Sequence, residues 1–290
     1  MKVAVLGAQG LLGQAFCSLC DAEGIEYLPF GRQCRIDNAL HLDEVFNYSF
    51  THLINYAGLS SPGACEAEPN KCWASHVLGT ELILERLFKR PDVRALFLGS
   101  SKMSDDSEYG GAKRTAFEMV TGYRQLYGLP VFTAVQHSTV CEGSGEDRWD
   151  GKIQKYIAEL IQWMQDNKLC VENLYFDDEW VRASLDNSAW NEAGEKAAFP
   201  KLRLRSINFS RDWISCEDAA RAHLLGLKSA NSDFEVGSGK LMSAAEYLKL
   251  AFGELNWQDF ILYGIGKSDH CIPAQIDWLA MQGWVASPLG

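Results

Sequence analysis

The chain opens with the stretch KVAVLGAQGLLG, Lys2–Gly13, and this stretch indicates the fold class. Lys2–Leu6 is apolar without alternation, as expected of a strand covered on both faces in a parallel sheet. Glycines follow at positions 7, 10 and 13, and Gln14–Ala22 has a helical pattern. A strand, a glycine turn and a helix together present backbone N–H groups and a helix N-terminus to a pyrophosphate. The stretch therefore predicts a dinucleotide-binding turn, with a plain tight turn as the alternative.

The second predicted strand, Glu26–Phe30, ends where the adenosine ribose of a dinucleotide would lie. An acidic residue there would accept hydrogen bonds from a free ribose 2′-hydroxyl and indicate NAD, but Arg32 follows instead, with Arg35 close behind. A guanidinium suits a 2′-phosphate, so the sequence favours NADP(H) and leaves NAD(H) open. Asp37 could reach the adenine, or it could cap a helix predicted over Leu40–Tyr48.

Two further strands place small and polar groups at the same edge of a parallel sheet. Thr51–Gly58 ends in Ala57 and Gly58, which would let a cofactor approach the backbone, and Val93–Gly99 is followed by Ser100. In an open parallel sheet ligands bind at the carboxyl ends of the strands. A serine hydroxyl at this place could bind a substrate carbonyl or alcohol.

Tyr109 and Lys113 are the pair whose spacing predicts chemistry. They open a run to Leu126 that has apolar residues at helical spacing, so they lie one turn apart on one face of a helix. An ammonium beside a phenol favours the phenolate, which makes Tyr109 a usable proton donor or acceptor. The alternative is a coincidental pair on an exposed helix.

These motifs together resemble the extended short-chain dehydrogenase/reductase family, also called the NAD-dependent epimerase/dehydratase family. Some segments are similar to GDP-mannose 4,6-dehydratases and GDP-fucose synthases. The resemblance implies an α/β fold, a Rossmann doubly wound parallel sheet with a smaller C-terminal substrate-binding domain. It implies that Ser100 and Tyr109 surround the reacting carbon, with Ser101 as the fallback, and that Lys113 binds the nicotinamide ribose and lowers the pKa of Tyr109. The cofactor-binding residues are expected to be Gly7, Gln9, Gly10, Leu11, Leu12, Gly13, Arg32, Asp37, Ala57, Gly58, Tyr109 and Lys113.

The dinucleotide-binding domain is expected over residues 1–141 with returning segments at about 213–238, and the substrate-binding domain over 142–212 and 239–290. An Arg at the position of Arg211 binds the nucleotide diphosphate in relatives, and a bidentate guanidinium suits that task. His137 follows a further strand, which is predicted over Leu129–Val135. It is either a second acid/base or a histidine held by its neighbours. Residues 168–200 match the family poorly and could be a lid or a partner surface.

Three departures from the family pattern affect the predicted reaction. Lys102 stands where dehydratases carry an acidic residue, the loop from Ser100 to Tyr109 is short, and His76 replaces a frequent Asn. We therefore expect an NADP(H)-dependent oxidoreductase of nucleotide-activated sugars, most of all a 4-keto sugar reductase. An epimerase or 4,6-dehydratase is the first alternative, and a non-catalytic cofactor-binding sensor or scaffold is the second. The predicted substrate contacts are Ser101, Lys102, His137 and Arg211.

Composition limits the partners and the location. The chain has 290 residues and a net charge of −11, which makes nucleic acid a poor partner. It has no apolar run long enough for a membrane span and no signal peptide at Met1–Leu6, so we expect a cytoplasmic protein with a homodimer as an option. The nine cysteines are expected to be reduced thiols. No metal site is predicted, because Cys17 and Cys20 have no distant partner pair.

Overall fold

The computed structural model describes residues 1–146, 148–170, 174–176, 180–183, 198–264 and 268–289. The chain divides into two compact units. Unit 1 contains residues 1–141, 212–240 and 273–289, and unit 2 contains residues 142–211 and 241–272. The sequence placed the last segment, Pro273–Leu289, with the second domain. The structure corrects this, because Leu279 and Trp284 are buried in the core of unit 1.

Unit 1 is built on a six-stranded sheet in the order β12-β5-β4-β3-β1-β2, and all its strands are parallel. Strand β2 lies on one side of β1, and β3 lies on the other side. The direction in which successive strands are added to the sheet therefore reverses at β1. This is the doubly wound Rossmann arrangement that the family resemblance implied. The strands of the sheet are β1 (Lys2–Leu6), β2 (Glu26–Phe30), β3 (His52–Asn55), β4 (Arg94–Ser100), β5 (Val131–Gln136) and β12 (Phe234–Val236).

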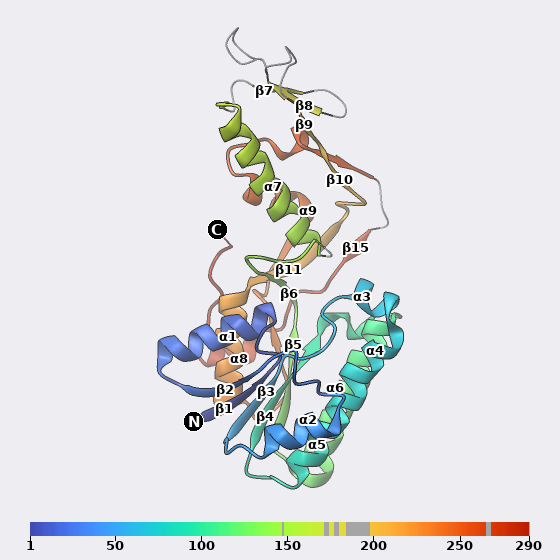
Figure 1. Ribbon diagram of the computed structural model, residues 1–290, viewed down its shortest axis with the longest axis vertical. Coiled ribbons are helices and arrows are strands. Elements are labelled where there is room, and N and C mark those ends of the chain that lie inside the picture. Colours follow the sequence, from blue (N-terminus) through green and yellow to red (C-terminus); the bar gives the residue numbers. More distant parts are fainter. Residues whose placement is uncertain (147, 171–173, 177–179, 184–197, 265–267, 290) are drawn as a thin grey trace. The chain divides into compact units, whose positions relative to one another are not determined.

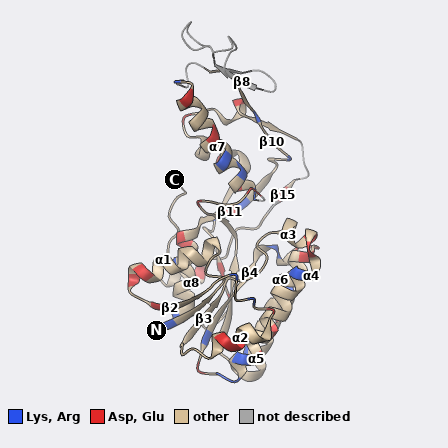
Figure 2. Ribbon diagram, in the orientation of Figure 1, with Lys and Arg blue, Asp and Glu red and all other residues tan. Residues whose placement is uncertain are grey.

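Helices cover both faces of this sheet, with α1 and α8 on one side and α2, α5 and α6 on the other (Figure 1). The cover explains why the strands are apolar without alternation, since each face needs apolar side chains. Figure 2 shows the charged residues mostly on the helices, while the strands carry few. The helices of unit 1 are α1 (Leu11–Glu23), α2 (Ala39–Phe46), α3 (Pro62–Ala67), α4 (Pro69–Trp73), the π-helix η1 (Ala74–Leu78), α5 (Gly79–Phe88), the 3-10 helix η2 (Ser101–Ser104), α6 (Glu108–Tyr127), α8 (Cys216–Ser229) and α10 (Asp277–Met281).

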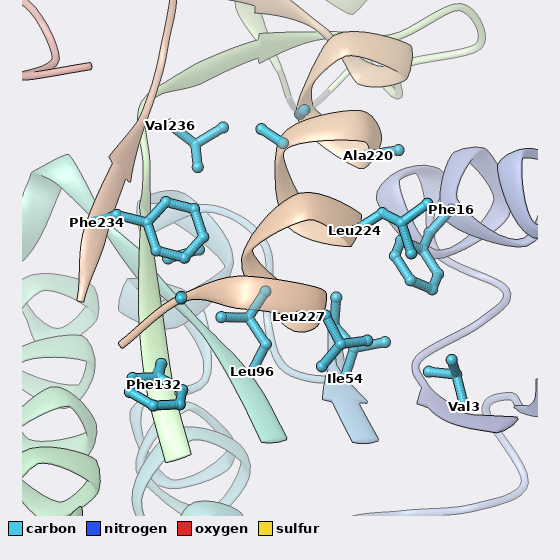
Figure 3. Packing of buried hydrophobic residues seen from close by; sticks show 14 of the residues in the cluster. Val3, Phe16, Ile54, Leu96, Phe132, Ala220, Leu224, Leu227, Phe234 and Val236 are labelled. Atoms are coloured by element: carbon cyan, nitrogen blue, oxygen red, sulfur yellow. The ribbon is translucent and has the colours of Figure 1, made fainter. Parts of the chain in front are cut away.

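Successive residues of one strand supply the two cores. On β1, Val3 and Val5 face the cluster under α1 and α8, whereas Ala4 and Leu6 face the cluster under α2 and α5. Figure 3 shows Phe16 of α1 and Leu224 of α8 close together in the first cluster. Burying one such side chain contributes about 1.5 to 3 kcal/mol. The two cores hold the carboxyl edge of the sheet in place, and that edge carries the predicted site.

Unit 2 consists of the long helix α7 (Trp149–Asp166), a second helix α9 (Ala244–Phe252) and short strands. Ser243-Ala244-Ala245-Glu246 has the sequence pattern of a capping box, and the side chains of Ser243 and Glu246 form that box at the start of α9. Strand β11 (Phe209–Ser215) carries the chain from unit 2 into unit 1 and pairs there with β6 (Ser138–Val140). The remaining elements are β7 (Leu174–Phe176), β8 (Trp180–Ala183), β9 (Ala198–Pro200), β10 (Leu202–Leu204), β13 (Leu241–Ser243), the 3-10 helix η4 (Trp257–Asp259), β14 (Ile261–Tyr263) and β15 (Asp269–His270).

Two disulfides correct the expectation of reduced thiols for four of the cysteines. Cys65 pairs with Cys72, and Cys141 pairs with Cys216 across 75 positions of sequence. The spacing of the cysteines along the chain could not predict either pair. Tertiary packing brings α3 next to α4, and it brings the end of β6 next to the start of α8. Among the described residues, no helix has an apolar stretch long enough to cross a membrane.

Candidate active site at the carboxyl edge of the sheet

The glycine turn after β1 is shaped by close backbone packing. Gly7 has φ +75°, and a Cβ atom on it would lie 2.6 Å from the backbone nitrogen of Ala57. A Cβ on Gly13 would lie 2.3 Å from the carbonyl oxygen of Gly7. Only glycine fits both positions. Helix α1 therefore begins directly against the strand, and its N-cap, Gly10, offers no side-chain acceptor to the first N–H groups.

Gln9 ties this turn to the end of β2. Its Oε1 accepts a 3.0 Å hydrogen bond from the backbone N–H of Arg32. Arg32 is exposed beside the glycine turn, and its guanidinium forms no ion pair within the described part of the chain. Arg35 differs, because its guanidinium holds Asp37 through two hydrogen bonds of 3.0 and 2.6 Å. This ion pair lowers the pKa of Asp37.

Asp37 was expected to contact adenine or to cap a helix over Leu40–Tyr48. The cap is the next residue, since the side chain of Asn38 accepts from the N–H of Leu40 and α2 begins at Ala39. Residues 34–36, which precede Asp37, form no strand and lie in a bend and a turn. The bidentate pair with Arg35 accounts for Asp37 without a ligand.

Small residues follow β3 at the same edge. The side chain of Asn55 accepts a 3.0 Å bond from the N–H of Ala57, which turns the chain immediately after the strand. Gly58 has φ +141°, and a Cβ atom on it would meet the His76 ring at 2.5 Å. The predicted cofactor contacts included Ala57 and Gly58 but not Asn55, although an Asn two positions before a small residue is a known turn signal.

Helix α6 carries Tyr109 and Lys113 one turn apart, as the sequence predicted. The Nζ atom of Lys113 lies 5.9 Å from the centre of the Tyr109 ring and donates a 2.8 Å bond to the carbonyl oxygen of Leu98 on β4. Burial lowers the pKa of Lys113 to about 8. Ser107 caps the helix by accepting from the N–H of Gly110, so the short loop still delivers Tyr109 to the first turn.

Ser100 is the last residue of β4 and is buried, and its Oγ accepts from the N–H of Lys102. Ser101 starts the 3-10 helix that follows, so the strand ends at Ser100, one residue beyond the predicted end at Gly99. The ammonium of Lys102 pairs with Asp105 one turn later at 3.1 Å. The position that carries an acid in dehydratases is thus occupied by a cation with a local partner.

The other two expected substrate contacts have partners within the protein. His137 Nε2 lies 3.1 Å from Oε2 of Glu235 on β12, and its ring is buried. Arg211, in unit 2, binds the backbone and the carboxylate of Asp269 and stacks over the Phe209 ring at 5.0 Å. These contacts engage Nε2 of His137 and the guanidinium of Arg211 within the protein.

Asp212, the residue after Arg211, has a structural role that the sequence did not indicate. Asp212 is 1% exposed, and its carboxylate accepts four hydrogen bonds. Two come from the backbone N–H and hydroxyl of Ser238, and the others come from the N–H groups of Gly239 and Ala274. Such bonds compensate the carboxylate for lost hydration. Asp212 therefore ties the last segment of the chain to the end of β12.

His76 was noted in the sequence only because it replaces an Asn that is frequent in the family. It lies in the π-helix η1, is 4% exposed, and meets the Tyr109 ring edge to face with centroids 5.7 Å apart. Its Nε2 lies 3.0 Å from the carbonyl oxygen of Leu59. Burial, with a smaller contribution from the charge of Lys113, lowers its pKa to about 3, so the ring is neutral.

The doubly wound sheet, the glycine turn at the start of α1 and the Tyr109–Lys113 pair define a Rossmann enzyme of the extended short-chain dehydrogenase/reductase class. The chain belongs to the NAD dependent epimerase/dehydratase family, whose sequence model matches residues 3–237. A search of curated protein sequences found no significant match.

Solved structures share the fold over nearly the whole chain. UDP-glucose 4-epimerase from Thermus thermophilus, in complex with NAD, has a TM-score of 0.74 at 16% identity over 100% of this chain and 95% of that chain. RMD from Pseudomonas aeruginosa, complexed with NADPH, has a TM-score of 0.77 at 17% identity over 99% and 93%. dTDP-glucose 4,6-dehydratase from Bacillus anthracis, in complex with NAD, has a TM-score of 0.72 at 15% identity over 99% and 92%.

Proposed function

We propose that this protein is an NADP(H)-dependent reductase of a 4-keto sugar that is linked to a nucleotide. The observation that carries the proposal is the position of Lys113, which is half-buried on α6 with its ammonium beside the Tyr109 ring. A fixed positive charge stabilises negative charge on a phenol oxygen, so Tyr109 can give up its proton and take it back. Ser100, at the end of β4, is the second hydroxyl that we assign to the reacting oxygen.

The glycine turn fits the pyrophosphate of a dinucleotide. Gly7 and Gly13 have no room for a side chain, and the first N–H groups of α1 have no side-chain cap. These features leave the helix N-terminus accessible to an anion. A bound nicotinamide supplies the hydride, and the assignment of NADP(H) depends on the exposed guanidinium of Arg32.

Tyr109 is the proton donor in this proposal. As the carbonyl carbon is reduced, its oxygen gains negative charge and takes the phenolic proton of Tyr109. The charge of Lys113 then stabilises the phenolate until solvent returns a proton. The hydroxyl of Ser100 donates a hydrogen bond to the same oxygen and orients it.

Reduction is preferred over 4,6-dehydration because of Lys102. Elimination of water needs a general acid or base beside the leaving group. Lys102 occupies the position that dehydratases give to an acid, and its ammonium pairs with Asp105. Epimerisation is the second candidate, since it uses the same tyrosine with a cofactor that is regenerated in each cycle, and UDP-glucose 4-epimerase shares the fold.

The substitution Tyr109→Phe tests the proposal. We expect it to lower NADPH consumption with a 4-keto sugar nucleotide by at least about 100-fold while dinucleotide binding is retained, because only the proton donor is lost. Tyr123→Phe, on the same helix, is the matched control and should stay close to wild type. Equal turnover of Tyr109→Phe and wild type would refute the role of Tyr109.

The same assay separates the alternatives. An epimerase would interconvert 4-epimers of a sugar nucleotide without net use of NADPH. A sensor or scaffold would bind the dinucleotide, and neither the wild type nor the variants would turn over any sugar nucleotide.

A further inference from the structure

The Cys65–Cys72 disulfide and the imidazole of His76 lie together beside Tyr109. Cys65 lies on α3, Cys72 on α4 and His76 on η1, and all three are buried. Their candidate ligand atoms lie within 4.8 Å of one another. Among the described residues of the chain, this is the one such group of histidine, cysteine and acidic side chains. It is distinct from the glycine turn and from Ser100.

The hydrogen bond of His76 fixes which ring nitrogen can bind a ligand. The carbonyl oxygen of Leu59 can only accept, so the 3.0 Å contact requires a hydrogen on Nε2. In a neutral ring Nδ1 then carries the lone pair. Metal-binding histidines typically hold their second nitrogen in this way, by donation to a backbone carbonyl. The bond to Leu59 therefore supplies the tautomer and the orientation that a metal ligand needs.

We propose that Cys65, Cys72 and His76 form a zinc site when the Cys65–Cys72 disulfide is reduced. Two thiolates and one imidazole are a ligand set that zinc prefers, with the fourth position left to water or substrate. Two thiolate charges balance the charge of the ion, which suits a buried place. Cys72 and His76 are four residues apart on one continuous helical run, and Cys65 approaches from α3 with its Cα 5.0 Å from that of Cys72.

The disulfide and the zinc complex are alternative states of the same atoms. Two molecules of a thiol reductant such as glutathione transfer two electrons, the bond between Cys65 and Cys72 breaks, and one molecule of glutathione disulfide is released. Two protein thiols result, and Zn²⁺ displaces their two protons to solvent. Oxidation by glutathione disulfide reverses the sequence and releases the ion.

The site is next to the predicted proton donor. Cys65, Cys72 and Ala112 form one buried cluster, and Tyr109 packs against it. A bound zinc ion would cross-link α3, α4 and η1 next to the first turn of α6. We therefore expect zinc to raise the melting temperature of the reduced protein.

Cobalt titration of the full chain tests the site without any enzymatic assay. The protein is reduced with excess glutathione, freed of glutathione without oxygen, and titrated with Co²⁺ as the spectroscopic substitute for zinc. We expect one equivalent to give a thiolate-to-cobalt charge-transfer band that Zn²⁺ abolishes. Cys65→Ser and Cys72→Ser should each weaken binding by at least about 10-fold, and His76→Asn should do the same.

Cys17→Ser is the matched control, because Cys17 and Cys20 form the one CxxC pair of the sequence. It should leave the band and the affinity unchanged. Protein oxidised with glutathione disulfide should give no band. The absence of a band in reduced wild type, its persistence with equal affinity in the serine variants, or its loss in Cys17→Ser would each overturn the proposal. Circular dichroism of every variant separates lost ligands from lost folding.

Discussion

The ammonium of Lys113 lies 5.9 Å from the centre of the Tyr109 ring, one helical turn away on α6. Lys113 also reaches the carbonyl oxygen of Leu98, so β4 holds the cation in this position. Helical spacing brings the two residues to one face, and the strand then fixes the side chain. The first prediction follows from the charge of this lysine.

The proposed reductase activity should fall as the pH rises through about 8. Burial lowers the pKa of Lys113 to about 8, so the ammonium is charged below that pH and neutral above it. The neutral amine no longer stabilises the phenolate of Tyr109, and kcat/KM of the free enzyme reports this loss. Lys113→Arg keeps the charge at higher pH and should move the fall upward or remove it. An identical fall in Lys113→Arg would show that another group titrates.

Arg32→Ala should reduce the preference for NADPH over NADH by at least about 10-fold, since a guanidinium on a phosphate contributes a charge-assisted bond. Arg35→Ala is the control, because its guanidinium is held by Asp37. Titration of each variant with both cofactors, followed by fluorescence, gives the ratio. An unchanged ratio in Arg32→Ala would contradict a contact with the 2′-phosphate.

Gly7→Ala should abolish dinucleotide binding and destabilise the fold. A methyl group there must adopt φ near +75° and lies 2.6 Å from the Ala57 nitrogen. Gly24→Ala also needs a positive φ, +63°, but its methyl group meets nothing within 4 Å. The control should lose only about 1 kcal/mol of unfolding free energy. Urea denaturation compares the two variants, and equal losses would argue against close packing at the glycine turn.

Asp233→Asn should destabilise unit 1 by about 2 kcal/mol, because it breaks a half-buried bidentate ion pair. The carboxylate of Asp233 accepts two 2.6 Å bonds from Arg124 and one of 2.7 Å from the N–H of Thr133. Asp37→Asn weakens a pair whose cationic partner, Arg35, is exposed to solvent, and it should cost less. Urea midpoints of both variants test this order, and the reverse order would contradict it.

Local periodicity explains what could be predicted. The glycine turn, the spacing of Tyr109 and Lys113, and the capping box of Ser243 and Glu246 all depend on residues within one or two turns of each other. Steric limits at glycine and the 3.6-residue repeat of the helix act over that range. The sequence therefore indicated the Rossmann sheet and the expected proton donor before any tertiary contact was known.

Contacts between distant segments were decided only by the tertiary structure. Packing of α3 and α4 against α6 brings Cys65 and Cys72 together beside His76. Hydrogen bonding joins the last segment of the chain to Asp212. Asp37 was expected to reach the adenine or to cap a helix, and the fold places its carboxylate next to the Arg35 guanidinium. The energies of these contacts depend on which elements pack together in the fold and on how much water that packing excludes. Neither can be read from the spacing of residues along the chain.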